Sequence, residues 1–475
     1  MTGLRMLIVS ATTVLAVSAL GVVMPSPARA VPGPPSVDTA RVPADTPPGP
    51  EGNARQTKGC AGAGVLADSD LTQPPPPALT LQLAAAHRLS TGAGVSVAVI
   101  DTGVRAQPRL ANLVGGGDYV TAGGDGLSDC DAHGTLVAGI IGAAASPADG
   151  FVGVAPDAQI ISIRQSSDAF SADLPPGTDP NDPNAGRAAI ELRALARAVV
   201  HAANMNARVI NISIASCLNA ASGIDQGELG AALWYAASVH DAVIVAAAGN
   251  TSSGGGNPGG SSCSQNPPES PATPDDPRGW SQIKTISTPA NFAQHVVSVG
   301  FTSPTGTPSP YSLRGPWLGL AAPGTAIVSL NPLGGDGVVN GVAGPNNGSV
   351  PVAGSSYAAA YVSGAAALVR ARFPQLNARQ VIDRLTRTAH APARGLDNTV
   401  GAGLLDPLAA LSADVRLDGS GVGRFGSSAL PPIAAPPSRD RLPRVMALAT
   451  AGGAVILGCG LLGLPVLLRR RKQAR

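Results

Sequence analysis

Short apolar runs alternate with longer amphipathic segments through the central part of the chain. The apolar runs predict buried strands over residues 95–100, 158–163, 208–214, 242–247 and 295–299. Apolar residues spaced three or four positions apart predict helices over residues 134–145, 187–205 and 228–239, and two more that begin at Ser356 and Asn377. This alternation favours an α/β fold with a mostly parallel central sheet flanked by helices. In such a sheet a functional site lies off the carboxyl ends of the strands.

Both ends of the chain carry apolar segments outside this pattern. Residues 1–30 have a basic start, an apolar stretch and a small-residue site before Ala30, which is typical of a cleaved signal peptide. The alternative is that this segment stays uncleaved and anchors the chain in the membrane. Residues 445–468 contain no charged residue and are long enough to cross a bilayer as a helix. Because the basic tail at 469–475 follows at once, we expect the tail in the cytoplasm and the rest outside the membrane.

Two low-complexity segments separate these ends from the globular part. Residues 31–80 form a Pro-rich N-terminal arm, and its first half has too few apolar residues to fold alone. Residues 413–444 are rich in glycine and proline and form a linker. The globular domain therefore spans residues 81–412 and is tethered to a cell membrane by a single C-terminal helix.

Charge and metal-ligand spacing exclude several classes of function. The formal net charge is +2, so the chain lacks the large excess of basic residues that binding to nucleic acid needs. No cysteine or histidine pair has the spacing of a zinc site, and we expect neither a metal nor a cofactor. Two acidic pairs, Asp179 with Asp182 and Asp275 with Asp276, do not lie in a calcium-binding loop motif. The sequence therefore leaves calcium binding open.

Four of the five cysteines lie in the exported part of the chain: Cys60, Cys130, Cys217 and Cys263. Export to an oxidising compartment favours two disulfides, for which three pairings are possible. We favour Cys60–Cys130, which would attach the arm to the core. The second pair, Cys217–Cys263, would then tie a long Gly/Ser/Pro loop to the end of a neighbouring strand.

Four polar residues stand at the ends of the predicted elements. Asp101 and Asn250 end buried strands, whereas His133 and Ser356 stand where helices begin. The dipole of a helix favours a developing anion at its N-terminus, where Ser356 lies. Each residue alone could simply cap a helix or start a turn. Together they supply the nucleophile, base, orienting carboxylate and oxyanion donor that acyl transfer by serine needs.

With these four residues the chain resembles the subtilisin-like serine proteases. The resemblance covers about residues 90–412, and Asp101, His133 and Ser356 follow in the order expected of that fold. The Gly-Thr-Ser that is common before the nucleophile reads Gly354-Ser355-Ser356 here, which is a conservative change.

The resemblance implies a role for each residue. Ser356 attacks the substrate, His133 acts as general base and then as general acid, and Asp101 orients the imidazole. The side-chain amide of Asn250 and the backbone N–H of Ser356 hold the oxyanion.

The strand that lines the substrate cleft in this family usually ends in Ser-Leu-Gly-Gly. Here the substrate-binding residues read Ser213, Ile214, Ala215 and Ser216. Side chains in place of glycines are expected to narrow the cleft. Insertions at 165–186 and 251–285 follow neighbouring strands and are expected beside it, although both could instead be plain surface loops. This pattern favours selective protein substrates over general digestion.

The whole layout is similar to that of the mycosins, membrane-anchored subtilisin-like proteases associated with mycobacterial type VII secretion. That resemblance implies a serine endopeptidase whose partners are protein substrates, the membrane and the type VII secretion membrane complex, which it would also stabilise. The alternative is a mainly structural component of that complex with weak proteolytic use.

Overall fold

The computed structural model describes residues 33–173, 183–251, 263–269, 275–344, 348–393 and 395–415, together with Met446, Thr450, Ala451, Gly453 and Ala454. Residues 1–423 form one compact unit and residues 424–475 form a second. The predicted signal peptide and basic tail lie outside the described residues, as do nearly all of the linker and most of the predicted transmembrane helix. Within the part of the chain that the structure describes, no helix is both long and apolar enough to span a membrane.

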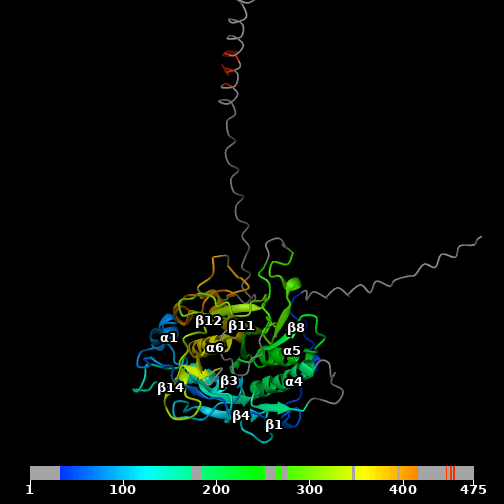
Figure 1. Cartoon of the computed structure of the whole chain (residues 1–475), viewed down its shortest axis with the longest axis vertical. Helices are drawn as coiled ribbons and strands as arrows, with labels where there is room; N and C mark the ends of the chain where they lie inside the picture. The colour runs from blue at the N-terminus through cyan, green and yellow to red at the C-terminus, as the bar shows by residue number, and fades with distance from the viewer. Residues whose placement is uncertain are drawn as a thin grey trace, which may run out of the picture. The chain divides into compact units, whose positions relative to one another are not determined.

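A seven-stranded sheet runs through the first unit in the order β12-β11-β9-β7-β3-β5-β4 (Figure 1). Every neighbouring pair in this sheet is parallel. Its strands are β3 (Ser96–Asp101), β4 (Leu113–Asp118), β5 (Gln159–Arg164), β7 (Val209–Ile212), β9 (Val243–Ala247), β11 (Val296–Thr302) and β12 (Leu318–Pro323). The α/β fold with a mostly parallel sheet that the sequence predicts is therefore confirmed.

The two outermost strands, β4 and β12, have no counterpart among the sequence-predicted strands. β4 reads Leu-Val-Gly-Gly-Gly-Asp and β12 reads Leu-Gly-Leu-Ala-Ala-Pro. Neither contains the run of β-branched residues that marks a strand in a sequence. Both form because a neighbouring strand, β5 or β11, offers its hydrogen-bonding edge.

Helices cover both faces of the sheet (Figure 1). Successive side chains of a strand point to opposite faces. Val97 and Val99 of β3 therefore join the buried cluster of α3 and α6, whereas Ala98 and Ile100 join that of α4 and α5. The helices are α1 (Pro76–Thr80), α2 (Leu83–Ala86), α3 (His133–Gly142), α4 (Pro183–Asn204), α5 (Gly227–Trp234), α6 (Ser355–Arg372), α7 (Ala378–Arg387) and α8 (Pro407–Ser412).

Two helices end earlier than their sequence patterns predict. α3 stops at Gly142 because Ala143 becomes extended and its carbonyl accepts a hydrogen bond of 2.8 Å from the Gly153 N–H. α5 is α-helical only to Trp234, and the chain continues as the π-helical turn η2 (Tyr235–Val239).

The remaining elements are short and lie around the sheet. Antiparallel pairs join β1 (Ala54–Gln56) to β6 (Phe170–Ala172), β8 (Ser216–Asn219) to β10 (Thr285–Thr288), and β13 (Ser329–Leu330) to β14 (Val338–Val339). A three-stranded sheet joins β2 (Ala63–Gly64), β15 (Gly341–Ala343) and β16 (Ser349–Pro351). Two 3₁₀ turns complete the set, η1 (Thr39–Arg41) and η3 (Trp280–Gln282).

The described part of the N-terminal arm lies against the rest of this unit. Its β1 and β2 pair with strands far along the chain, and Cys60 is joined to Cys130 in a disulfide. The Glu51 carboxylate accepts from Arg197 at 2.7 Å and pairs with Arg193 at 3.5 Å, and both arginines lie on α4. The arm lacks a core of its own, so contacts with the rest of the unit hold it in place.

We predict that Glu51→Gln lowers the free energy of unfolding by about 1 kcal/mol. The Glu51 and Arg197 side chains are only 14% and 22% exposed, so their charge-assisted contact is screened less than a surface ion pair. Chemical denaturation measures the change, and it is expected to shrink in 1 M salt.

Asp157→Asn is the matched control, since Asp157 is exposed and has no ion pair or side-chain hydrogen bond among the described residues. Equal destabilisation by both substitutions would contradict an arm held by Glu51.

Candidate active site

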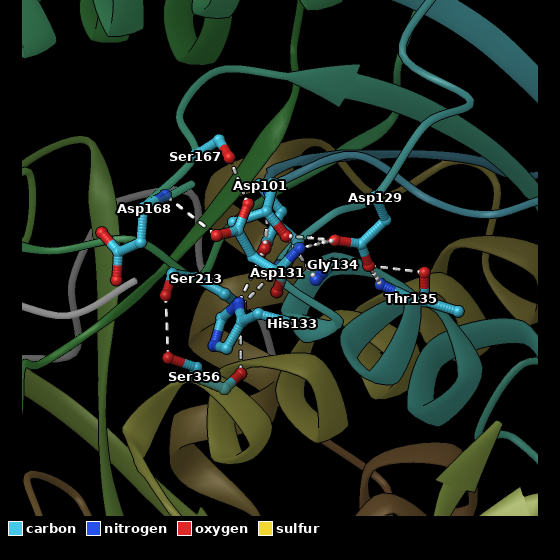
Figure 2. Close-up of polar contacts among 12 residues, drawn as sticks. Asp101, Asp129, Asp131, His133, Gly134, Thr135, Ser167, Asp168, Ser213 and Ser356 are labelled. Carbon is cyan, nitrogen blue, oxygen red and sulfur yellow. Dashed lines mark hydrogen bonds and ion pairs between the residues drawn. The ribbon is translucent and has the colours of Figure 1, made fainter. Parts of the chain in front are cut away.

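Asp101 and His133 meet at the carboxyl edge of the sheet. Asp101 is the last residue of β3 and fully buried, and His133 is the first residue of α3 and 3% exposed. The Nδ1 of His133 donates to the Asp101 Oδ1 at 2.7 Å, because an ionised carboxylate can only accept. The same oxygen accepts from the Thr102 N–H at 2.7 Å. Asp101 is thereby fixed against the imidazole, as Figure 2 shows.

This meeting depends on a close approach between the start of α3 and the loop after β3. The Gly134 N–H donates to the Thr102 hydroxyl at 2.9 Å. A Cβ added at Gly134 would lie 2.0 Å from the Gly103 carbonyl oxygen, so a larger residue would push the helix away. Ala132, immediately before the helix, has a φ of 67°, which turns the chain into α3 without a side-chain cap.

Asp129 fastens the same junction, a role that our interpretation of the sequence missed. Its Oδ1 accepts from the Thr102 hydroxyl at 2.9 Å, and its Oδ2 accepts from the Thr135 N–H at 2.9 Å and hydroxyl at 2.6 Å. Burial raises the pKa of Asp129 to about 6. An aspartate four residues before His133, with a threonine two residues after it, is the signal that could have identified this support.

Asp131 connects the His133 loop to the first insertion. Its carboxylate accepts from the Ser167 hydroxyl and from the Asp168 N–H, the latter at 2.9 Å (Figure 2). Burial raises the pKa of Asp131 as well. Since Cys130 is bonded to Cys60 of the arm, two separate segments hold the loop that leads into α3.

The charges around His133 decide its protonation. Burial alone would lower the pKa of His133, but the Asp101 carboxylate, helped by Asp129 and Asp131, raises it above the ordinary value. The imidazole therefore binds a proton readily, as a general base must.

Ser356 is the second residue of α6 and 4% exposed. Its hydroxyl donates to the Ser213 carbonyl at 2.8 Å, and the Ser213 hydroxyl donates to the Ser356 carbonyl at 3.0 Å. In Figure 2 the imidazole lies between Asp101 and Ser356. Rotation of the Ser356 side chain about its Cα–Cβ bond is needed before its proton can pass to His133. Such contacts often tighten only when substrate binds.

Asn250 follows β9 and faces the first turn of α6. Its Oδ1 accepts from the Ser355 N–H at 2.9 Å. This bond turns the carbonyl end of the amide towards the helix and leaves the Nδ2 hydrogens for another acceptor. Gly249, with a φ of 98°, provides the turn that brings Asn250 there.

The predicted substrate-binding residues lie between β7 and β8. Ser213 is buried against Ser356, whereas Ile214, Ala215 and Ser216 are half-buried. Ser216 begins β8, pairs with Thr288 of β10 and donates its hydroxyl to the Glu191 Oε2 at 3.2 Å. The structure thus brings one end of this segment, Ser213, to the nucleophile.

The second disulfide lies at the same edge. Cys217 is joined to Cys263, and the Cys263 N–H donates to the Asn250 carbonyl at 2.9 Å. Both favoured pairings are present in the structure. The Cys217–Cys263 bond therefore ties the segment after Ser213 to Cys263, whose N–H in turn holds the Asn250 carbonyl.

Parts of both insertions lie outside the described residues, including Asp179 and Asp182. Asp276 accepts from the Trp280 and Ser281 N–H groups and so closes a local turn. Among the described side chains, no group of three or more His, Cys, Asp or Glu residues is placed to hold a metal ion.

Comparisons with known proteins agree with this geometry. The Subtilase family matches residues 92–403. Mycosin-1 of Mycobacterium tuberculosis (strain ATCC 25618 / H37Rv) is 47% identical over 95% of this chain and 98% of its own.

Two solved structures are also similar. One is described as a serine protease MycP1, an essential component of the type VII (ESX-1) secretion system. It is 51% identical, with a TM-score of 0.75 over 80% of this chain and 99% of its own. The other is a chain of an intact ESX-5 inner membrane complex, 45% identical, with a TM-score of 0.77 over 91% of this chain and all of its own. The protein described here belongs to the mycosins and is a subtilisin-like serine protease of the Subtilase family.

Proposed function

We propose that this chain is a membrane-anchored endopeptidase of a type VII secretion complex, with Ser356 as nucleophile, His133 as base and Asp101 as orienting carboxylate. The observation that carries the catalytic assignment is the buried hydrogen bond of 2.7 Å between His133 and Asp101, next to the first turn of the helix that bears Ser356.

The reaction begins when the Ser356 hydroxyl rotates from the Ser213 carbonyl towards His133. The hydroxyl oxygen then attacks the scissile carbonyl carbon while the Nε2 of His133 takes its proton. Asp101 stabilises the imidazolium that forms. As the amide bond breaks, the proton passes to the leaving amine. Water repeats the sequence and releases the acyl group from Ser356.

The oxyanion of the tetrahedral intermediate accepts hydrogen bonds from the Asn250 Nδ2 and the Ser356 N–H. The bond from the Ser355 N–H to the Asn250 Oδ1 supports this role, because it fixes which end of the amide points away from the helix. The N-terminus of α6 adds a favourable dipole. Loss of one such donor typically raises the barrier by about 3 kcal/mol.

The substrates are selected proteins that enter beside residues 213–216. Side chains at Ala215 and Ser216 reduce the space that glycines would leave. The Cys217–Cys263 disulfide and the β8–β10 pairing hold residues 213–216 in place. They therefore limit how far this segment can move to admit bulky substrates. Neither a metal nor a cofactor enters the proposed steps.

Membrane attachment comes from the ends of the chain. Residues 1–30 are a signal peptide, residues 413–444 a linker, residues 445–468 a transmembrane helix and residues 469–475 a cytoplasmic tail. The uncharged 445–468 segment followed by basic residues supports this topology. Similarity to a chain of an ESX-5 inner membrane complex supports membership of a corresponding complex.

A mainly structural role within such a complex is the second candidate. A similar chain occurs in a solved structure described as the periplasmic assembly from the ESX-5 inner membrane complex, and that favours this role. In that case the triad is used weakly and the folded domain itself is what the complex needs.

We predict that Ser356→Ala abolishes labelling by a fluorophosphonate probe, because it removes the attacking oxygen. The variant is expected to fold, since only one hydroxyl is lost. Gel fluorescence of the full-length protein measures the labelling. Ser298→Ala, which removes a buried serine hydroxyl of β11 that has no hydrogen-bond partner among the described residues, is the control and is expected to keep labelling.

Labelling that persists in Ser356→Ala would contradict the assignment of the nucleophile. The same variant also separates the two candidate functions. A secretion complex that stays assembled with Ser356→Ala but is lost on deletion of the chain would indicate a structural role in addition to proteolysis.

We predict that the labelling rate falls as the pH is lowered through the pKa of His133, with a midpoint above the ordinary 6.5. Protonation removes the base, and the Asp101 carboxylate favours the protonated form. Asp101→Asn is therefore expected to lower this midpoint. It is also expected to slow labelling at neutral pH by about 10⁴-fold, the size of the kcat loss for the same substitution in a chymotrypsin-like triad.

A pH–rate profile of both proteins measures the two effects. A midpoint that is the same in wild type and Asp101→Asn would contradict the role given to Asp101.

We predict that protease added to intact spheroplasts degrades the 81–412 domain and leaves a small membrane-bound fragment. The basic tail keeps the other end of the 445–468 segment inside the cell. Immunoblotting with tags at residue 81 and at the C-terminus measures both parts. Full protection of the domain while a periplasmic control is digested would show that the proposed orientation is wrong.

A further inference from the structure

Tyr357, the residue after Ser356, contacts the ring of the catalytic histidine. Its ring centroid lies 5.4 Å from that of His133, and the two planes are tilted by 48°. The tyrosine is 1% exposed and lies in the first turn of α6. The helix that carries the nucleophile therefore also presents an aromatic surface to the base.

Among the described residues, one side-chain hydrogen bond orients the imidazole, and packing must fix the rest of its position. Its Nδ1 edge is held by the Asp101 Oδ1. One hydrogen bond allows the ring to swing about its Cα–Cβ bond unless neighbouring atoms block the other rotamers.

We propose that Tyr357 is a positioning residue for His133, whose aromatic ring blocks one side of the imidazole and keeps it aligned between Asp101 and Ser356. This inference rests on the proposed function, in which His133 acts as the base. Tyr357 itself touches no reacting atom in that mechanism.

The ring, rather than the hydroxyl, carries this role. Within the described residues the Tyr357 hydroxyl has no hydrogen-bond partner. Burial, and then the charges of Asp101 and Asp129, raise the pKa of Tyr357, so the phenol stays neutral while His133 titrates. A neutral flat ring adds no charge beside the imidazole, and phenylalanine would reproduce its surface.

The Tyr357 ring also contributes to the burial of His133, which is 3% exposed. Burial by itself lowers the pKa of His133, while Asp101, Asp129 and Asp131 raise it. Replacing the ring by a smaller side chain would admit water and weaken the effect of burial. The pKa of His133 would then rise further. As the pH falls, the neutral imidazole that acts as the base would be protonated at a higher pH than in the wild type.

The test uses the full-length protein and a fluorophosphonate probe, with labelling rates measured against probe concentration and pH. Tyr357→Leu is expected to lower the maximal rate by about 10- to 100-fold, because small misalignments of catalytic groups have effects of this order. The probe concentration at half-maximal rate is expected to stay the same. The midpoint of the acid limb is expected to move up.

Tyr357→Phe is expected to restore most of the rate and the original midpoint. Tyr361→Leu is the matched control, because Tyr361 is a second buried tyrosine one turn further along α6 and burial alone raises its pKa. It is expected to lower the melting temperature as Tyr357→Leu does, without changing the rate or the midpoint. Should Tyr357→Leu fail to fold, Tyr357→Met, which fills the space without a flat ring, is expected to show the same rate loss.

A labelling rate in Tyr357→Leu or Tyr357→Met equal to that of wild type would overturn the inference. So would an equal loss in Tyr361→Leu, or a loss in Tyr357→Phe as large as that in Tyr357→Leu. Absence of labelling in the wild type would instead overturn the proposed function, and this inference would fall with it.

Discussion

The contact between the start of α3 and the end of β3 is the constraint on which the active site depends. It brings a buried imidazole within 2.7 Å of a buried carboxylate. The approach is possible because Gly134 has no Cβ and because Thr102 accepts its N–H. Asp129 then links Thr102 to Thr135 and holds both sides of the junction. A change in any of these groups would move His133 relative to Asp101.

Burying several carboxylates near one histidine is unfavourable unless each has partners. The described contacts provide them, since Asp129 accepts from threonines and Asp131 accepts from the Ser167–Asp168 segment. The Cys60–Cys130 disulfide and the ion pairs of Glu51 attach the arm to the same unit. The arm therefore belongs to the support of the site, although its composition alone would suggest a disordered leader.

The nucleophile is positioned in a different way, by a helix that consists largely of small residues. Alanine, glycine and serine dominate α6 from Ser355 onwards, and the helix is buried through Arg370. Small side chains let α6 lie close against the sheet, so that Ser356 reaches the end of β7 and Ser213. Asn250 meets the same turn from β9. One helix N-terminus thus gathers the attacking hydroxyl, the proposed oxyanion donors and the ring of Tyr357.

The sequence by itself determined the α/β fold, because buried strands and amphipathic helices leave periodic patterns of apolar residues in it. It also indicated Asp101, His133, Asn250 and Ser356, since each stands at the end of a predicted element. It could not reveal β4 and β12, whose glycines and alanines form strands only beside a neighbour. Nor could it reveal how Thr102 and Tyr357 support the start of α3 and His133, because both act through contacts between segments far apart in the chain. Those contacts exist only once the tertiary fold has closed.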